Sequence, residues 1–138
     1  MKNGYRKFKN TVSKVQFHIV FCPRYKRKIF NVEGVRERFE MLARTECENN
    51  DIDILEMDCG KDYVHLKLNV PPTMSANDAM YAIKRNTAKK LQEEFPMFAS
   101  MTALWTQTCL VTTDDKLSQK DIDDFVMSLP SSPYMKKG

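Results

Sequence analysis

The chain has 138 residues, of which 42% are hydrophobic and 29% charged, with a net charge of +4, four Gly and six Pro. This length and composition predict one globular domain with its own core, and they exclude a disordered or collagen-like chain. No apolar run approaches the roughly 20 residues of a membrane helix, and the basic N-terminus lacks the apolar stretch of a signal peptide, so we expect a cytoplasmic protein with no membrane partner.

The first third of the chain predicts an arm, a strand and a helix. Residues 1–13 are expected to form a basic N-terminal arm. Residues 14–22 begin with alternation and become continuously apolar and β-branched, which predicts a central strand ending at Pro23. After the basic turn PRYKRK, apolar side chains recur at helical spacing over 32–49, and polar residues then end that helix.

The middle of the chain predicts a hairpin and a long helix. Residues 52–59 alternate as a half-buried strand, and a tight turn at 60–62 leads into the strand 63–70, so the two strands should pair. After Pro71-Pro72, Ser75 can cap a helix and Asp78 can complete its capping box, and Pro96 closes the helix.

The last third predicts a strand over 103–113, a helix capped by Ser118, and a flexible tail over 130–138. The resulting order β-α-β-β-α-β, followed by one helix, predicts an α+β fold of the ferredoxin-like split β-α-β kind for residues 14–129. Its antiparallel sheet would carry helices on one face and leave the other face free for a ligand. Many functions share this architecture, so the fold alone does not decide the function.

The cysteines and the charges narrow the class of partner. Cys22, Cys47, Cys59 and Cys109 form no C-x-x-C pair, which argues against a zinc knuckle and predicts reduced thiols. Residues 1–32 hold nine Lys and Arg and no acidic residue, whereas residues 33–138 carry a charge of −5. Such asymmetry is typical of a protein that binds phosphate backbones, although a solubilising tail beside a solvated turn is the alternative. The aromatic residues among these charges, Tyr5, Phe8 and Tyr25, could stack on unpaired bases.

Four stretches of the sequence resemble the single-tyrosine HUH transposases of the insertion sequence 200/605 type. The resemblance is collinear over roughly residues 14–128 and includes an aromatic–His–apolar strand that leads into a P-x-Y-x-R turn. It implies small homodimers that bind DNA hairpins and cut single-stranded DNA beside them. The four stretches are FHIVFCPRYKRKIF (17–30), DYVHLKLNVPP (62–72), AIKRNTAKKLQEEFP (82–96) and LWTQTCLVTT (104–113).

The resemblance also implies an active site, and this sequence departs from it. In the family, a histidine–apolar–histidine strand and a glutamine on the last helix hold a divalent metal, and a tyrosine on that helix attacks the phosphate. Here His65 is retained, Tyr63 stands at the other histidine position, Phe125 at the nucleophile and Leu129 at the glutamine. Three of four positions that act as a unit are therefore substituted, which favours a site without nicking activity.

Two alternatives remain at this point. In an active transposase with relocated ligands, Tyr63 or Tyr134 would serve as nucleophile, with Mg²⁺ or Mn²⁺ on carboxylates. The second alternative is an RNA-binding regulatory protein on the same fold. Independently of these alternatives, His18 and His65 could be purely structural histidines of their strands. The carboxylates considered are Glu56, Asp121, Asp123 and Asp124.

The favoured hypothesis is a transposase-like protein that binds hairpin or single-stranded nucleic acid as a homodimer, with no cofactor expected. Loss of the metal ligands and the nucleophile leaves the basic residues in place, and these can neutralise phosphates. Those on the helix could equally form a solvated face. The candidate binding residues are Arg24, Tyr25, Lys26, Arg27 and Lys28 in the turn and Lys84, Arg85 and Lys89 on the helix.

Overall fold

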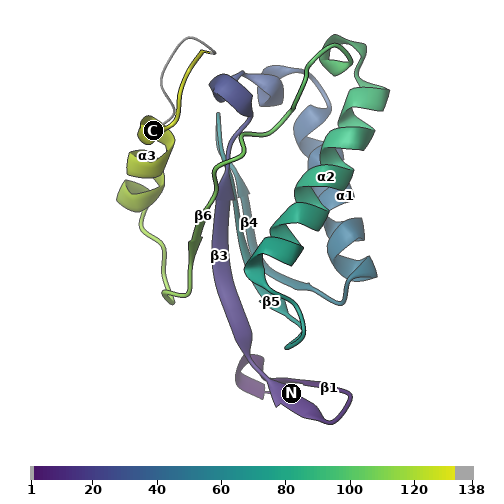
Figure 1. The fold of residues 1–138 in the computed structure, drawn as a ribbon, viewed down its shortest axis with the longest axis vertical. Helices are drawn as coiled ribbons and strands as arrows, with labels where there is room; N and C mark the ends of the chain where they lie inside the picture. Colours follow the sequence, from purple (N-terminus) through teal and green to yellow (C-terminus); the bar gives the residue numbers. More distant parts are fainter. Residues whose placement is uncertain (1, 133–138) are drawn as a thin grey trace.

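The computed structural model describes residues 2–132 and contains a four-stranded antiparallel sheet with strand order β4-β5-β3-β6 (Figure 1). Residues 133–138, which include Tyr134 and most of the predicted tail, lie outside the described range. The elements, with η for a 3₁₀ helix, are η1 (Lys2–Gly4), β1 (Arg6–Phe8), β2 (Thr11–Ser13), β3 (Val15–Phe21), η2 (Arg24–Lys26), η3 (Ile29–Asn31), α1 (Val35–Asn49), β4 (Asp53–Cys59), β5 (Val64–Val70), α2 (Ala76–Glu94), η4 (Pro96–Phe98), β6 (Leu110–Thr112) and α3 (Gln119–Ser128).

The element order and the sheet confirm the predicted α+β, ferredoxin-like fold. Strand β3 pairs with β5 over its whole length and with β6 on its other edge. Strands β4 and β5 form the predicted hairpin, in which the Gly60 N–H donates to the Tyr63 carbonyl at 2.9 Å. No helix of the described residues is long and apolar enough to cross a membrane.

Helices α1 and α2 cover one face of the sheet (Figure 1). The capping box at the start of α2 is present: the Ser75 hydroxyl accepts from the Asp78 N–H at 3.0 Å, and the Asp78 carboxylate accepts from the Ser75 N–H at 3.2 Å. Helix α1 starts three residues later than predicted, after Gly34 with φ +86°. Both helices turn one apolar stripe to the sheet, so burial of that stripe adds to their intrinsic helix propensity.

An aromatic cluster joins the helices to the sheet. The Phe21, Phe39 and Trp105 rings pack edge to face, with centroids 5.0–6.3 Å apart. The Trp105 indole N–H donates to the Thr87 hydroxyl at 3.1 Å, and this hydroxyl donates to the Ile83 carbonyl at 2.7 Å. Both polar groups are therefore satisfied in the core.

The predicted strand over 103–113 is wrong in extent, because only Leu110–Thr112 is strand β6. Leu104 and Trp105 are consecutive and both buried, which the alternating faces of a regular strand do not allow against a single core. The Thr106 carbonyl accepts the Lys84 ammonium at 2.6 Å, so a side chain occupies an acceptor that a strand partner would use.

The second face of the sheet is not free, contrary to expectation. Helix α3 lies across it, on the side opposite α1 and α2 (Figure 1). Its residues Ile122 and Val126, together with Leu129 just after the helix, pack with Val20 of β3 and with Cys22, which follows β3, in a second apolar cluster. The sequence of α3 is amphipathic, and the apolar side of such a helix packs against another element, which here is the sheet.

The N-terminal residues form a hairpin in the structure. Strands β1 and β2 pair antiparallel, with Lys7 opposite Val12, and project beyond the end of the main sheet (Figure 1). Over residues 6–13, the expected arm is thus a two-stranded β-ribbon.

All four cysteines are free thiols. Burial raises the pKa of the Cys22, Cys47 and Cys59 thiols to about 12, so these groups stay protonated and unreactive at neutral pH.

Replacement of Thr87 by Val removes the hydroxyl and keeps the side-chain volume. We expect the free energy of unfolding to fall by about 1–3 kcal/mol, because the buried Trp105 N–H loses its acceptor. Urea denaturation followed by the fluorescence of Trp105 measures the change. Thr45 is exposed on α1, so Thr45→Val is a matched control with an expected effect below about 0.5 kcal/mol. Equal losses in the two variants would contradict the role of this hydrogen bond.

Candidate functional site

Two histidines meet on the face of the sheet toward α3. His18 of β3 and His65 of β5 lie two residues apart across the ladder, since Val20 is the register partner of His65. The His18 Nδ1 and His65 Nε2 atoms are 2.8 Å apart, and the rings stack with centroids 5.0 Å apart. Both side chains are buried, with 1% and 8% exposed.

The hydrogen-bond network assigns the protons of this pair. The His18 Nε2 atom lies 3.0 Å from the Asp115 carbonyl, which can only accept, so His18 carries its proton on Nε2. In a neutral ring Nδ1 is then an acceptor, and His65 Nε2 must be the donor to it. When both rings are neutral, the Nε2 atom of His65 therefore has no lone pair left for a metal ion.

Burial favours the neutral form of His65. It lowers the pKa of His65 below the ordinary value of 6.5, and the neighbouring His18 and Lys67 lower it further. Glu56 and Asp58 act in the opposite direction with smaller effect than burial and His18. A neutral His65 fits the donor role assigned to it above.

Tyr63 is tied to the neighbouring strand. Its hydroxyl donates to the Asp58 carboxylate at 3.1 Å. Partial burial raises the pKa of the Tyr63 phenol, and Asp58 raises it further, although Gln119 acts in the opposite direction. A tyrosine that acts as a nucleophile needs its phenolate form to become accessible, so this environment works against that role.

Helix α3 presents carbon atoms to the same face. Ser118 caps the helix as predicted, accepting from the Asp121 N–H at 3.1 Å. Leu129, just after the last turn, is 4% exposed, and the half-buried Phe125 packs beside it against the cluster that includes Tyr63. Tyr63 and Phe125 thus both pack against the apolar cluster that contains Leu129.

These residues do not fit a divalent metal. Within residues 2–132 there is no group of three or more His, Cys, Asp and Glu side chains placed to hold one. Two carboxylates of α3 are engaged on its exposed side, where Asp123 accepts from Gln119 at 2.9 Å and Asp124 pairs with Lys120 at 2.8 Å. The proposed relocation of ligands to α3 therefore has no support in the side-chain positions.

The PRYKRK turn follows β3 and holds its charges around one aromatic ring. The Arg24 and Arg27 guanidinium groups lie 5.0 and 5.8 Å from the centre of the Tyr25 ring. Tyr25 and Lys26 both have positive φ, 58° and 54°, which makes the turn tight. Lys28 lies 3.7 Å from Asp62, and its side chain is 56% exposed.

The α2 candidates divide into two kinds. Arg85 and Lys89 are exposed, whereas the Lys84 ammonium donates to the Thr106 carbonyl and lies 3.4 Å from the Cys109 sulfur. Lys84 therefore fixes the segment before β6 to the helix. The i, i+1 spacing in the sequence could not separate these two roles.

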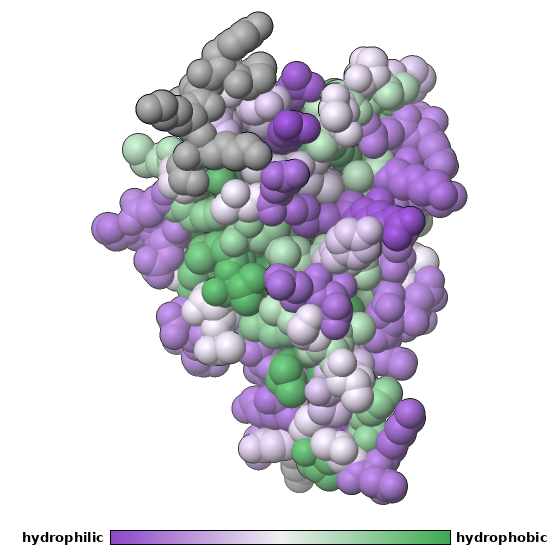
Figure 2. Space-filling view, viewed as in Figure 1, coloured by the Kyte–Doolittle hydropathy of each residue, from purple (hydrophilic) through white to green (hydrophobic). Residues whose placement is uncertain are grey.

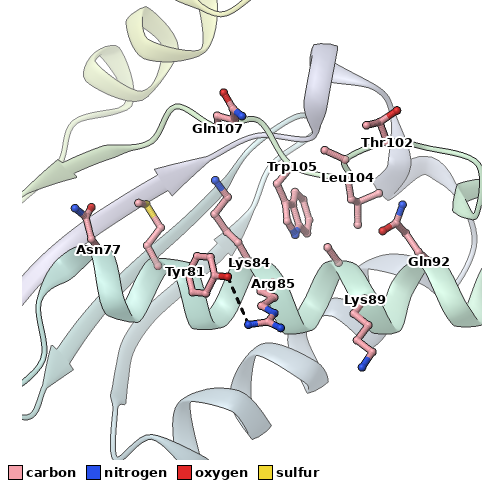
Figure 3. Close-up of a pocket in the computed structure, with 13 residues that line it drawn as sticks. Asn77, Tyr81, Lys84, Arg85, Lys89, Gln92, Thr102, Leu104, Trp105 and Gln107 are labelled. Carbon is pink, nitrogen blue, oxygen red and sulfur yellow. Dashed lines mark hydrogen bonds between the residues drawn. The ribbon is translucent and has the colours of Figure 1, made fainter.

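A groove of about 700 Å³ lies between α2 and the segment 102–107 (Figure 3). Trp105 and Leu104 form part of its apolar lining, and Tyr81 and Arg85 stand together on α2, with the tyrosine hydroxyl 3.5 Å from the guanidinium. No acidic side chain lines it. Tyr81 was missed in the sequence; its i, i+4 spacing from Arg85 was the available signal.

Comparison with known proteins places this geometry in context. The family described as "Transposase IS200 like" matches residues 11–128. The transposase for insertion sequence element IS200 of Salmonella typhimurium (strain LT2) is 36% identical over 80 residues, 58% of this chain and 52% of that protein. The chain thus aligns with about half the length of that relative. The ISDra2 transposase TnpA of Deinococcus radiodurans is 21% identical over 126 residues, 89% of each protein.

Solved structures share the fold. A Deinococcus radiodurans R1 protein assigned as a transposase superposes with a TM-score of 0.81 at 21% identity, covering 92% of this chain and 99% of that one. A REP-associated tyrosine transposase bound to a REP hairpin gives a TM-score of 0.56 at 10% identity, covering 89% and 69%.

The lowered pKa of His65 makes stability depend on pH. Well above the ordinary pKa of 6.5 His65 is neutral in both states; as the pH falls through this pKa the unfolded chain takes up a proton before the folded one, so the free energy of unfolding falls. In His65→Gln the amide can still donate to His18 but does not titrate. We expect the free energy of unfolding of this variant to fall less steeply between pH 7.5 and 5.5 than that of the wild type. The slopes should differ by at most about 1.4 kcal/mol per pH unit. Urea titrations at three pH values measure this, and parallel curves would contradict it.

Proposed function

The chain belongs to the IS200-like transposase family, and we propose that it binds hairpin or single-stranded DNA as a homodimer without cutting it. In this proposal residues 14–129 form the transposase-like domain, and no cofactor is required. The family resemblance supports the class of nucleic acid, and the side chains of the candidate site support the absence of cutting in this proposal.

The observation that carries the proposal is the hydrogen bond between His18 Nδ1 and His65 Nε2. It uses the ring nitrogen of the one metal ligand that the resemblance retains. The other three positions offer a phenol bonded to Asp58, a phenyl ring and an aliphatic side chain. None of these polarises a phosphate, and Phe125 has no oxygen with which to attack one.

Retention of binding is supported by the charge that remains. The exposed cations of the turn and of α2 can neutralise phosphates, and the Tyr25 and Tyr81 rings can stack on unpaired bases. The groove beside Trp105 combines apolar side chains with basic ones such as Arg85 and Lys89 and has no acidic side chain in its lining, which suits a base and its phosphate. The relative solved with a REP hairpin has the same fold, which is consistent with a DNA hairpin as ligand.

A homodimer is supported by the sheet edges. Strands β4 and β6 are the outer strands, and each exposes an apolar side chain, Leu55 at 44% and Val111 at 39%. Unpaired strand edges are templates for pairing with a second chain. A particle of about twice the 16.1 kDa chain mass in light scattering would support this part, and a monomer at micromolar concentration would overturn it.

We expect no cleavage of a hairpin-bearing single-stranded DNA in Mg²⁺ or Mn²⁺. The readouts are a shortened labelled strand and a protein–DNA adduct that survives denaturation. The triple variant Tyr63→His, Phe125→Tyr, Leu129→Gln refills the family pattern and provides a comparison in which chemistry is possible. Cleavage and an adduct with the wild-type chain would overturn the proposal in favour of an active enzyme with relocated ligands.

Binding should depend on the exposed cations. In Arg27→Gln/Lys89→Gln, two phosphate contacts are lost, so the log–log salt slope for hairpin DNA should become shallower by about 1.4–1.8. Lys116→Gln/Lys120→Gln removes the same charge from exposed positions elsewhere and should leave the slope unchanged. Fluorescence anisotropy between 50 and 300 mM salt, about the useful range for such slopes, measures both. Tight RNA binding with hairpin DNA no better than a duplex control would favour the RNA-regulatory reading instead.

A further inference from the structure

The N-terminal ribbon has no role in the site described above. Strands β1 and β2 are joined by a two-residue turn, in which Lys9 has φ +54°. The ribbon projects from the end of the molecule opposite α3, and hydrophilic residues alternate there with less polar ones (Figures 1 and 2). Its two strands are short, so the ribbon is a compact protrusion.

One side of the ribbon is exposed, basic and partly apolar. Tyr5 and Val12 are 48% and 53% exposed, and Lys7, which is also exposed, is the register partner of Val12. The Lys14 ammonium lies 5.6 Å from the centre of the Tyr5 ring. Because side chains alternate along a strand, Arg6 and Phe8 lie on the other, partly buried side.

The root of the ribbon is fixed to the sheet. The Arg6 guanidinium donates to the Asn69 carbonyl at 3.1 Å and lies 3.4 Å from the Asp53 carboxylate. The buried Asn69 amide donates to the Gly4 carbonyl at 2.6 Å, and Gly4 itself has φ +81°. A protrusion held in this way loses less conformational entropy on binding than a free arm.

The charges of the ribbon are available to a ligand. Asp53 neutralises Arg6, but within residues 2–132 Lys7, Lys9 and Lys14 have no carboxylate within 4.0 Å. Residues 1–32 contain no acidic residue at all. The ribbon therefore attracts phosphates.

We propose that the β1–β2 ribbon enters the major groove of the double-stranded stem of a DNA hairpin. This groove is about 12 Å wide and admits a two-stranded β-ribbon. Lys7 and Lys14 would contact phosphates, and Tyr5 and Val12 would meet base edges, where the thymine methyl is an apolar partner. The inference rests on the proposed DNA-hairpin binding and specifies which part of the hairpin this segment contacts.

The same geometry selects DNA over RNA. The major groove of an A-form RNA helix is deep and narrow, so the ribbon cannot enter it. The ribbon and the PRYKRK turn lie at opposite ends of β3, whose seven residues span about 23 Å. That length corresponds to about seven base pairs at 3.4 Å each, so one end can contact the stem while the other contacts the loop or the flanking single strand.

The decisive variant is Lys7→Gln/Lys14→Gln, titrated with a DNA hairpin, an RNA hairpin of the same sequence and the unpaired DNA strand. Each lost phosphate contact is worth about 0.9 log unit at 0.1 M salt, so hairpin affinity should fall by up to about 60-fold and the slope should become shallower by about 1.8. Affinity for the unpaired strand should stay within about twofold. The wild-type protein should prefer the DNA stem to the RNA stem.

Dimethyl sulfate footprinting locates the contact, because guanine N7 lies in the major groove. Stem guanines should be protected by the wild type and by Lys116→Gln/Lys120→Gln, and exposed again with Lys7→Gln/Lys14→Gln, whose unfolding midpoint should match the wild type. Unchanged affinity and protection in the ribbon variant, or equal binding of the RNA stem, would overturn this inference and leave the proposed function standing. Absence of all hairpin binding by the wild type would overturn the proposed function itself.

Discussion

The structure depends on the pairing of β3 along both of its edges. Strand β3 pairs with β5 on one edge and with β6 on the other, which fixes its position in the sheet. Its alternating side chains therefore face two different environments. Phe17, Ile19 and Phe21 point to the core beneath α1 and α2, whereas His18 and Val20 point to α3. One strand thus supplies both the main hydrophobic core and the floor of the candidate site, and the two cannot change register independently.

On the face of the sheet toward α3, the arrangement of the side chains depends on the free-energy cost of burying polar atoms. His18 and His65 are nearly inaccessible to water, so each ring nitrogen that is not bonded would carry a penalty of about 1–3 kcal/mol. The Asp115 carbonyl requires a proton on His18 Nε2. In the neutral ring His18 Nδ1 is then an acceptor, and His65 Nε2 donates to it. The same carbonyl also accepts from Lys67 at 3.1 Å, which holds the loop before α3 against the sheet. This network stabilises the buried pair and engages the Nε2 atom of His65, the histidine at a ligand position of the resemblance.

Much of the fold could be predicted from the sequence because its local signals agree with its packing. The capping box at Ser75, the helix stripe of α1 and the turn at Gly60 are short-range features, and each is present. The predictions failed where contacts between residues distant in the sequence determine the structure. Lys84 bonds to Thr106, 22 positions away, and thereby shortens β6 and leaves the nucleic-acid candidates on α2 to Arg85 and Lys89. The histidine pair, 47 positions apart in sequence, was likewise invisible to spacing rules, although each histidine was noted.

The three substituted positions are linked through packing as well as chemistry. In the absence of a metal, a glutamine at the place of Leu129 would bury an amide beside Val20 and Cys22, where the surrounding cluster offers only apolar side chains and a thiol. A tyrosine at the place of Phe125 would add a hydroxyl to the same half-buried seam. Without a metal, hydrophobic side chains at Phe125 and Leu129 are therefore more stable in this cluster than a hydroxyl or an amide would be. Phe125, Leu129 and Tyr63 thus share one apolar environment, whereas the exposed basic residues of the turn and of α2 take no part in this cluster.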